Sequence, residues 1–283
     1  NGTSWLHEAT LPLPQARNAY YPRKAIAISG DYVIAGFADA FDPDPVAIYH
    51  RNNGDWIQQA SLQPPASSQY FALSVDISGD TAVVGSPTDS GGQALVYRRA
   101  ADYWYLEATL IEPGEQESGF FASEVAIDGD TLLVGSIGEG GWAFERSDNT
   151  WSFVERIQSQ TDDEIGCSID LDGDVAVMGS RHNSSERTVV VFRRDSDGHW
   201  MEEQELTTMI PESPPLGRVV RISGDTVLTN SGFDFTASGA RDSEREVFLA
   251  EATNSIRGDD DGLNSPGNAH LFRYEDGLWR ETK

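Results

Sequence analysis

Residues 74–86 read SVDISGDTAVVGS, and this pattern occurs five times in the chain. The other copies are AIAISGDYVIAGF (25–37), EVAIDGDTLLVGS (124–136), SIDLDGDVAVMGS (168–180) and VVRISGDTVLTNS (219–231). Each copy has a short apolar stretch, a Ser/Asp-Gly-Asp turn and a second apolar stretch. The turn aspartates, beginning with Asp31 and Asp80, recur at intervals of about 44 to 51 residues. A period of this length is typical of a protein built from stacked copies of one unit.

Two further β-type stretches follow each copy. The third is apolar and ends in a basic or aromatic residue, as in ALVYRR (94–99), and the fourth carries a tryptophan near its start, as in YWYLEATL (103–110). Stretches rich in Val, Ile, Tyr, Phe and Trp between polar turns predict strands. Four strands per unit at this period predict the blade of a β-propeller. A β-sandwich is the alternative, but it does not predict five in-phase copies of one motif.

We therefore predict an all-β fold, a single β-propeller domain over residues 1–283 with four-stranded blades. The repeat units span residues 20–62, 70–110, 120–157, 164–206 and 216–283. Five blades follow from these units, and six blades are the alternative if residues 247–252 contribute a strand of a degenerate extra unit. The fifth unit contains a long insertion at 232–267, which we expect on the face of the propeller that carries the long loops.

The residues that open each unit point to a family. Before the inner strands stand Tyr20-Tyr21, Tyr70-Phe71-Ala72, Phe120-Phe121-Ala122, Ile165-Gly166 and Leu216-Gly217, and the second strands end in GF, GSP, GSI, GSR and NS. The unit resembles the FG-GAP repeat, the blade motif of integrin α-subunit propellers and of many bacterial surface proteins. The resemblance implies a propeller and a binding or adhesion role. The integrin type carries Asp-x-Asp-x-Asp-Gly calcium loops between its first two strands, whereas the tight turn here leaves no room for a twelve-residue cation loop.

Composition excludes several classes of partner. The 283 residues include 20 Lys and Arg and 46 Asp and Glu, which gives a net charge of −26. Such a surface repels phosphate and anionic lipid, so we expect no nucleic acid partner and no membrane insertion. The single cysteine, Cys167, excludes an intrachain disulfide and a Cys-cluster metal site. It lies two residues before the apolar Ile169, so we expect its thiol to be buried and unreactive.

Aromatic residues at the start of the inner strands are the first candidates for ligand binding. They are Tyr20, Tyr21, Tyr70, Phe71, Phe120 and Phe121. Together with the acidic long loops they could form aromatic platforms ringed by carboxylates, which suit sugars or cations. The alternative is that they wedge between adjacent blades, because residues that recur in phase usually build the repeat.

The inner strands break the repeat at one position. It is occupied in turn by Ala27, Asp76, Ala126, Asp170 and Arg221. If these residues line the central channel, then Asp76, Asp170 and Arg221 face one another there and are candidate ligand-binding residues. A structural ion pair is the alternative. The sequence shows no Ser-His-Asp spacing, phosphate loop or zinc motif, so we assign no catalytic residue.

The insertion at 232–267 supports a metal hypothesis. Asp259, Asp260, Asp261 and Asn264 supply hard oxygen ligands near a tight turn, as Ca²⁺ requires. The overlapping tripeptide Arg257-Gly258-Asp259 matches an integrin-recognition sequence, and a solvated acidic loop is the third interpretation. Calcium is the only cofactor that the sequence points to, and no organic cofactor is expected.

The N-terminal segment bears on how the propeller closes. The tryptophan stretch occurs six times, whereas the other three strands occur five times, and the extra copy is SWLHEATL (4–11). A propeller closes without an unpaired edge when strands from both chain ends share a blade. We predict that residues 4–11 form a closing strand on the fifth blade, beside or in place of the strand at Trp279.

These observations favour a non-enzymatic, secreted or cell-surface binding or adhesion module. It would recognise a glycan or protein ligand on the long-loop face, with Ca²⁺ as a candidate cofactor. One alternative is a polysaccharide-degrading enzyme, a lyase or a glycosidase, on a propeller scaffold. Another is a structural domain of a larger multidomain surface protein.

Overall fold

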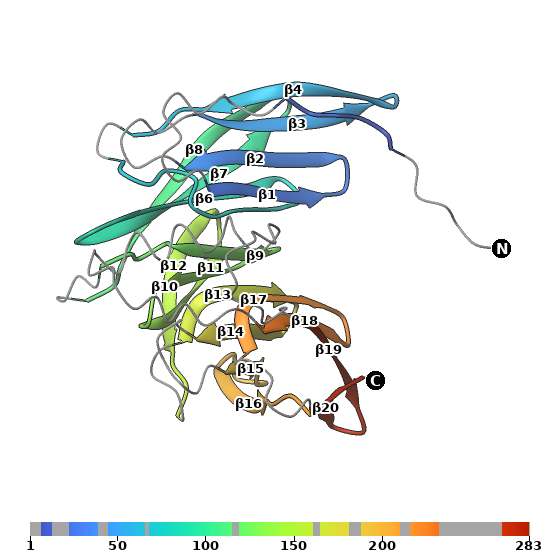
Figure 1. The fold of residues 1–283 in the computed structure, drawn as a ribbon. Coiled ribbons are helices and arrows are strands. Elements are labelled where there is room, and N and C mark those ends of the chain that lie inside the picture. Colours follow the sequence, from blue (N-terminus) through green and yellow to red (C-terminus); the bar gives the residue numbers. More distant parts are fainter. Residues whose placement is uncertain are drawn as a thin grey trace, which may run out of the picture.

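The computed structural model describes residues 7–12, 23–38, 45–65, 68–114, 119–160, 165–180, 188–209, 216–231 and 268–282. All regular secondary structure in these residues is β-strand, arranged as five antiparallel sheets of four strands each. Figure 1 shows the sheets stacked in chain order, with the first at one end and the fifth at the other. This confirms the predicted all-β fold of propeller-type sheets. The blade count stays a prediction, because residues 232–267 lie outside the described part of the chain.

Within each sheet the strands are adjacent in chain order. The first sheet contains β1 (Arg23–Ser29), β2 (Tyr32–Ala38), β3 (Val46–Asn52) and β4 (Asp55–Leu62). The second contains β5 (Val75–Ser78), β6 (Thr81–Thr88), β7 (Gly91–Ala100) and β8 (Tyr103–Ile111). The third contains β9 (Glu124–Asp128), β10 (Thr131–Ser136), β11 (Gly140–Ser147) and β12 (Thr150–Ile157). The fourth contains β13 (Ile165–Asp172), β14 (Val175–Ser180), β15 (Val189–Arg194) and β16 (Trp200–Leu206). The fifth contains β17 (Leu216–Ser223), β18 (Thr226–Ser231), β19 (Asn268–Glu275) and β20 (Leu278–Glu281).

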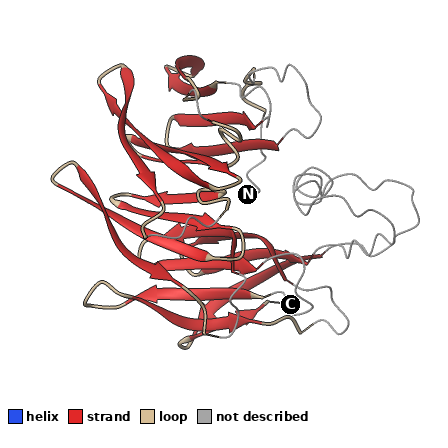
Figure 2. Ribbon diagram, turned by 90° about the vertical axis from the view of Figure 1, so that its left-hand side faces the viewer, coloured by secondary structure: helices blue, strands red, loops and turns tan. Residues whose placement is uncertain are grey.

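The Ser/Asp-Gly-Asp signature fixes the first three strands of each sheet. In the first sheet Ser29 pairs with Tyr32 across a two-residue turn, and Gly30 has a φ of 56°. Glycine adopts this left-handed conformation without the steric cost that a side chain would add. The carbonyl of the turn aspartate Asp31 then accepts the amide of Arg51 in the third strand, at 2.8 Å. The same backbone bond occurs in all five sheets, and the short turns lie along one side of the stack (Figure 2).

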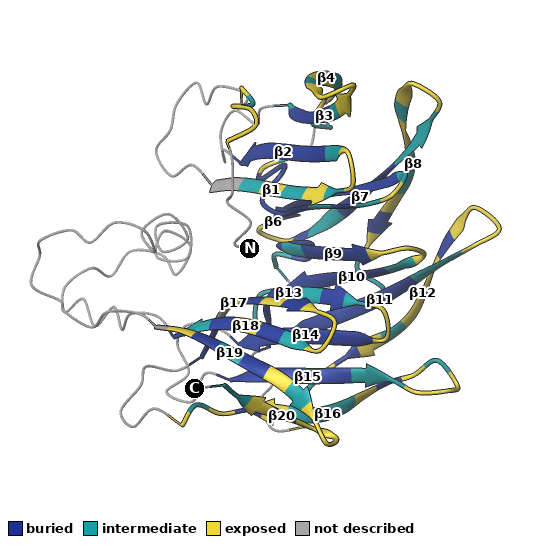
Figure 3. Cartoon of the chain, turned by 90° about the vertical axis from the view of Figure 1, so that its right-hand side faces the viewer, coloured by how far each residue is buried: buried dark blue, intermediate teal, exposed yellow. Residues whose placement is uncertain are grey.

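The core lies between neighbouring sheets. In the first four sheets the second strands are buried on both faces (Figure 3), and one equivalent position of β2, β6, β10 and β14 is 0% exposed in each case, whereas Leu228 at that position of β18 is 46% exposed. The buried residues at that position are Ile34, Val83, Leu133 and Val177. Burying a side chain of this size contributes about 1.5 to 3 kcal/mol. Cys167 in β13 is also buried, as predicted.

Neighbouring inner strands are joined by a ladder of side-chain-to-backbone hydrogen bonds, in which a side chain of one sheet accepts an amide of the next. Between the second and third sheets, Val125 donates to Ser74 (3.1 Å), Ile127 to Asp76 (2.7 Å) and Gly129 to Ser78 (3.0 Å). Between the fourth and fifth, Val220 donates to Ser168 (3.1 Å), Ile222 to Asp170 (2.7 Å) and Gly224 to Asp172 (2.6 Å). At the other two junctions an alanine, Ala27 or Ala126, stands at the middle position and supplies no acceptor.

The second residue of the opening dipeptide is glycine where the backbones of two sheets approach most closely. Gly166 has a φ of 103°, and a Cβ at this position would lie 2.2 Å from the carbonyl oxygen of Gly140 in the third sheet. No side chain fits at that distance. The same close approach occurs at Gly217, where a Cβ would lie 2.4 Å from the carbonyl oxygen of Thr188, so it explains the glycine of the fourth and fifth repeats.

Residues 7–12 lie against the outer part of the first sheet. Glu8 accepts a hydrogen bond from Trp56 Nε1 (3.3 Å) and forms an ion pair with Arg51 (2.8 Å). The Tyr49 hydroxyl donates to the carbonyl of Pro12, and Leu11 packs on the apolar cluster that contains Tyr49. The predicted pairing of residues 4–11 with the fifth sheet stays a prediction, and residues 4–6 lie outside the described part of the chain.

Candidate functional site

The aromatic residues singled out in the sequence divide into two kinds in the structure. Phe71 and Phe121 are 0% exposed and belong to the cores on either side of the second sheet. The ring of Phe121 meets Trp142 edge to face, with centroids 5.3 Å apart. In this conformation both rings act as wedges between sheets and do not reach a ligand. Tyr20 and Tyr21 lie outside the described residues.

Tyr70 and Phe120, by contrast, form an aromatic pair on the loops that lead into the second and third sheets. Their ring centroids are 5.9 Å apart. Tyr70 is 9% exposed, and Phe120 is half-buried. The loop after β6 contributes the exposed Asp89, whose amide donates to Gln69 Oε1 at 3.4 Å. We call Gln69, Tyr70, Asp89 and Phe120 the loop patch.

The backbone of Phe120 is held in an unusual conformation. Its φ is 70°, in the left-handed region that bulky residues rarely adopt. Its amide donates to the carbonyl of Thr88 (2.9 Å), and its carbonyl accepts the amide of Ser123 (3.0 Å). Such conformations cost about 1 to 3 kcal/mol and cluster at ligand sites. The strain therefore motivates a functional role for the loop patch.

Asp76, Asp170 and Arg221 occupy equivalent positions on three inner strands, and their charges influence one another. Burial raises the pKa of Asp76 to about 6, and the charge of Asp170 adds to this effect. Two amide hydrogen bonds and the charge of Arg221 act in the opposite direction. Burial also raises the pKa of Asp170. Both carboxylates accept amides of the following sheet, so their visible role is structural, whereas Arg221 is exposed.

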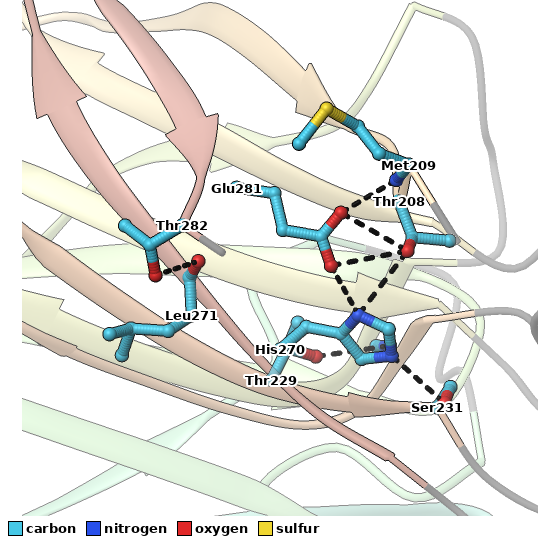
Figure 4. Close-up of polar contacts among 9 residues, drawn as sticks. Thr208, Met209, Thr229, Ser231, His270, Leu271, Glu281 and Thr282 are labelled. Carbon is cyan, nitrogen blue, oxygen red and sulfur yellow. Dashed lines mark hydrogen bonds and ion pairs between the residues drawn. The ribbon is translucent and has the colours of Figure 1, made fainter.

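A buried polar cluster in the fifth sheet escaped the sequence analysis (Figure 4). His270 Nε2 lies 2.9 Å from Ser231 Oγ, and His270 Nδ1 lies 2.6 Å from Glu281 Oε1. Thr208, on the connection after β16, lies 3.2 Å from both carboxylate oxygens of Glu281, and the amide of Met209 donates to Oε2 at 2.6 Å. The cluster thus joins β18, β19, β20 and the connection from the fourth sheet.

Hydrogen bonding governs the ionisation of Glu281 in this cluster. Burial raises the pKa of its carboxyl, but the hydrogen bonds from His270, Met209 and Thr208 outweigh burial, so the pKa lies below the ordinary 4.5. The two ring nitrogens of His270 bond Glu281 and Ser231 at once, one on each side of the ring. All the polar groups are then satisfied.

Ser231, His270 and Glu281 have the order of a nucleophile, a base and an orienting carboxylate. Ser231 and His270 are each 1% exposed, however, so the hydroxyl is closed to a substrate in this conformation. The serine is also a general feature of the repeat, because Ser86, Ser136 and Ser180 occupy the equivalent position in the second strands of three other sheets and are equally buried. We therefore interpret the cluster as a buried hydrogen-bond network that holds the strands of the fifth sheet together.

The repeat itself carried a signal for this cluster. By strand register, His270 occupies the position that holds Leu95, Trp142 and Val190 in the preceding three sheets. All three are buried apolar residues. A histidine at an otherwise apolar core position requires buried partners, so aligning the third strands would have singled it out.

The predicted calcium ligands Asp259, Asp260, Asp261 and Asn264 lie outside the described residues. In the part of the chain that the structure describes, no three His, Cys, Asp or Glu side chains converge as a metal site would require. The same part contains no helix with the length and apolarity needed to cross a bilayer.

Comparison with known families supports the resemblance seen in the sequence. Residues 56–97 match the family model of the FG-GAP repeat. The match starts at Trp56 in β4 and runs through β5 and β6 into β7. It therefore contains the inner hairpin of the second sheet and the connection that holds Gln69 and Tyr70. No curated protein sequence matches the chain.

Solved structures resemble the chain at low sequence identity. A chain in the crystal structure of the mitotic checkpoint complex aligns with a TM-score of 0.51 and 16% identity, over 82% of this chain and 69% of that one. The computationally designed Ika4 protein gives a TM-score of 0.44 and 13% identity, over 66% of this chain and 99% of its own. A chain of the S. cerevisiae Dbp5, Nup159 and Gle1 complex gives a TM-score of 0.46 and 12% identity, over 96% of this chain and 62% of that one. At these identities only the fold is informative.

Proposed function

We propose that this protein is a non-enzymatic binding module of the integrin-like propeller type, which recognises a ligand through its long-loop face. The FG-GAP match at residues 56–97 supports the module type. The loop patch supports the location, because it gathers an aromatic pair, an amide and an exposed carboxylate from the loops of two neighbouring sheets. Because FG-GAP repeats are typical of extracellular proteins, the proposal includes a secreted or cell-surface location.

The chemistry of the loop patch favours a glycan over a protein ligand. The half-buried ring of Phe120, packed beside Tyr70, offers apolar surface for the C–H face of a sugar ring. Asp89 and Gln69 lie within hydrogen-bonding reach of each other and can accept or donate to hydroxyl groups. A few polar groups placed beside aromatic surface are typical of small-ligand sites. The strained backbone of Phe120 is the observation that carries this assignment.

Glycan-array binding of the full chain tests the proposal. The Phe120→Ala and Asp89→Ala variants should each lose binding by at least about tenfold, equivalent to about 1.4 kcal/mol. The matched control is Tyr103→Ala, which removes one ring of an exposed aromatic pair on β8 with centroids 6.0 Å apart. Equal losses in all three variants, or no loss in the patch variants, would contradict the assignment.

Calcium and catalysis are separate arms of the same experiment. Binding that is lost in EDTA and restored by Ca²⁺ would support the proposed calcium site. The double variant Asp259→Asn and Asp261→Asn should then fail to bind even in Ca²⁺. Breakdown of a polysaccharide without a stable complex would instead favour the enzyme alternative. Binding that is insensitive to EDTA would leave the module intact and remove calcium from the proposal.

A further inference from the structure

The face of the first sheet that carries Ile26 and Ile28 is exposed to solvent, whereas the equivalent face of every other described sheet is covered by the preceding sheet. Ile26 and Ile28 of β1 are 67% and 65% exposed. The residues at these two positions in the other sheets are Val75 and Ile77, Val125 and Ile127, Ile169 and Leu171, and Val220 and Ile222, each at most 8% exposed. In those sheets the preceding sheet covers the pair. Figure 3 shows the contrast between β1 and the buried β9.

Residues 7–12 already occupy part of the place of a preceding sheet. Glu107 of β8, in the second sheet, contacts two residues of the third sheet. It accepts a hydrogen bond from Trp151 Nε1 (3.0 Å) and forms an ion pair with Arg146 (2.8 Å). Glu8 makes the same two contacts with Trp56 and Arg51 of the first sheet. Both glutamates stand three residues after a tryptophan in the same stretch, WLHEATL and WYLEATL. Residues 7–12 therefore lie where the outermost strand of a preceding sheet belongs.

Among the residues that the structure describes, this outermost segment belongs to no sheet. The other five tryptophan stretches pair with the third strand of their sheets, as β8 does with β7. No strand in the described part of the chain pairs with residues 7–12. The fifth sheet cannot supply the partner in the same way, because β20 already pairs with β19 as its outermost strand. A segment whose backbone pairs with no described strand can take part in strand addition.

We propose that the first sheet binds a three-stranded antiparallel β-unit of this same repeat type, which packs on Ile26 and Ile28 and takes residues 7–12 as its fourth strand. The ladder between sheets defines the chemistry of this unit. Its inner strand would present small side chains or hydrogen-bond acceptors, as Ser168 and Asp170 do toward the fifth sheet. Its acceptors would meet the amides of Ile26 and Ile28, and its third strand would pair with residues 7–12.

A chimera tests the fit directly. Residues 165–194, the three inner strands of the fourth sheet, are placed before Asn1 of the full chain. The junction leaves Asn1 to Ser4 between Arg194 and Trp5, a turn as long as residues 52–55 in the first repeat. Hydrogen exchange of the Ile26 and Ile28 amides should slow by ~100-fold relative to the unmodified chain. These amides should then match those of Val220 and Ile222, which donate to the same acceptors in the fourth sheet.

Controls separate docking from general stabilisation. The chimera with Ile28→Asp should lose the slow exchange, whereas Leu106→Asp, at another exposed apolar residue on an outer strand (49%), should keep it. A second chimera with residues 68–99 in place of 165–194 guards against a failure of one particular unit to fold. Exchange at Ile26 and Ile28 that is unchanged in both chimeras would overturn the proposal.

Sedimentation of the unmodified chain tests the competing occupant, a second copy of this protein. We expect a monomer at all concentrations, because net charge of −26 on each copy opposes self-association. Association that Ile28→Asp abolishes and Leu106→Asp preserves would assign the face to a second copy and overturn the proposal.

Discussion

Replacement of Asp76 by asparagine should increase the stability of the variant relative to the wild type as pH rises from mild acid to neutrality. Asp76 lies on the inner strand β5 and accepts amides from Ile77 (2.8 Å) and Ile127 (2.7 Å). Burial nevertheless raises its pKa from 3.8 to about 6. The carboxyl group therefore costs stability when it is ionised. Asparagine is uncharged like the protonated acid, but its Nδ2 group cannot accept an amide, so the loss of one hydrogen bond adds a cost that is the same at every pH.

The magnitude follows from proton linkage. Because the folded-state pKa is above the unfolded-state value, the folded protein binds the proton more tightly and its stability falls as pH rises from about 4 to 6. The two pKa values differ by about 2, and at about 1.4 kcal/mol per unit the full effect is about 3 kcal/mol. Between about pH 4.5 and 7.5, the wild type should lose about 2 kcal/mol relative to Asp76→Asn.

Urea denaturation followed by tryptophan fluorescence at several pH values measures this difference. The structure adds a coupling test, because the charge of Asp170 contributes to the raised pKa of Asp76 and that of Arg221 opposes it. The pH dependence of the Asp76→Asn effect should shrink in an Asp170→Asn background and grow in an Arg221→Gln background. A difference that is constant across the pH range, or one that grows in acid, would refute the reasoning.

Three further outcomes are expected. Glu107→Gln should cost more stability in urea denaturation than Glu139→Gln, because the largely buried Arg146 loses its shortest ion pair and keeps only the longer one to Asp130 (3.5 Å), whereas Glu139→Gln breaks an exposed pair and should cost less than about 1 kcal/mol. Glu281→Gln should be less stable than the wild type at neutral pH, and the gap should close as pH falls below about 4.5, because a lowered carboxyl pKa stabilises only the ionised state; thermal melts across this range would show a constant gap if the reasoning is wrong. A thiol reagent should modify Cys167 only after unfolding, and rapid labelling of the folded protein would contradict its burial.

The repeat predicted the architecture because one short motif determines several contacts at once. The glycine of the Ser/Asp-Gly-Asp turn sets the hairpin, and the carbonyl of its aspartate fixes the third strand, as Asp31 does for Arg51. These interactions are local in sequence, so pattern alone reveals them. The strand pairs inside each sheet follow from the same pattern, and the described strands agree with it in all five sheets.

The sites were less predictable because they depend on what each repeat places against the next. Phe71 and Tyr70 are neighbours in sequence, yet one is a core wedge and the other belongs to the loop patch. His270 was missed because its partners come from two other strands and from Thr208 in a connecting segment, so no local spacing links them. A comparison of equivalent positions between repeats detects such a residue, whereas a search for motifs along the chain does not.

Closure of the sheet array depends on a contact that no single repeat encodes. The tryptophan stretch serves two sheets, because its backbone pairs with the third strand of its own sheet and its glutamate binds the next, as Glu107 binds Arg146. The sequence therefore predicts that residues 4–11 are a strand, but it cannot tell which of the two contacts is made. In the structure Glu8 makes the contact with the next sheet, at Arg51. The exposed Ile26 and Ile28 indicate that the backbone partner of residues 7–12 is a further sheet, because a sheet that paired with these residues would cover both side chains.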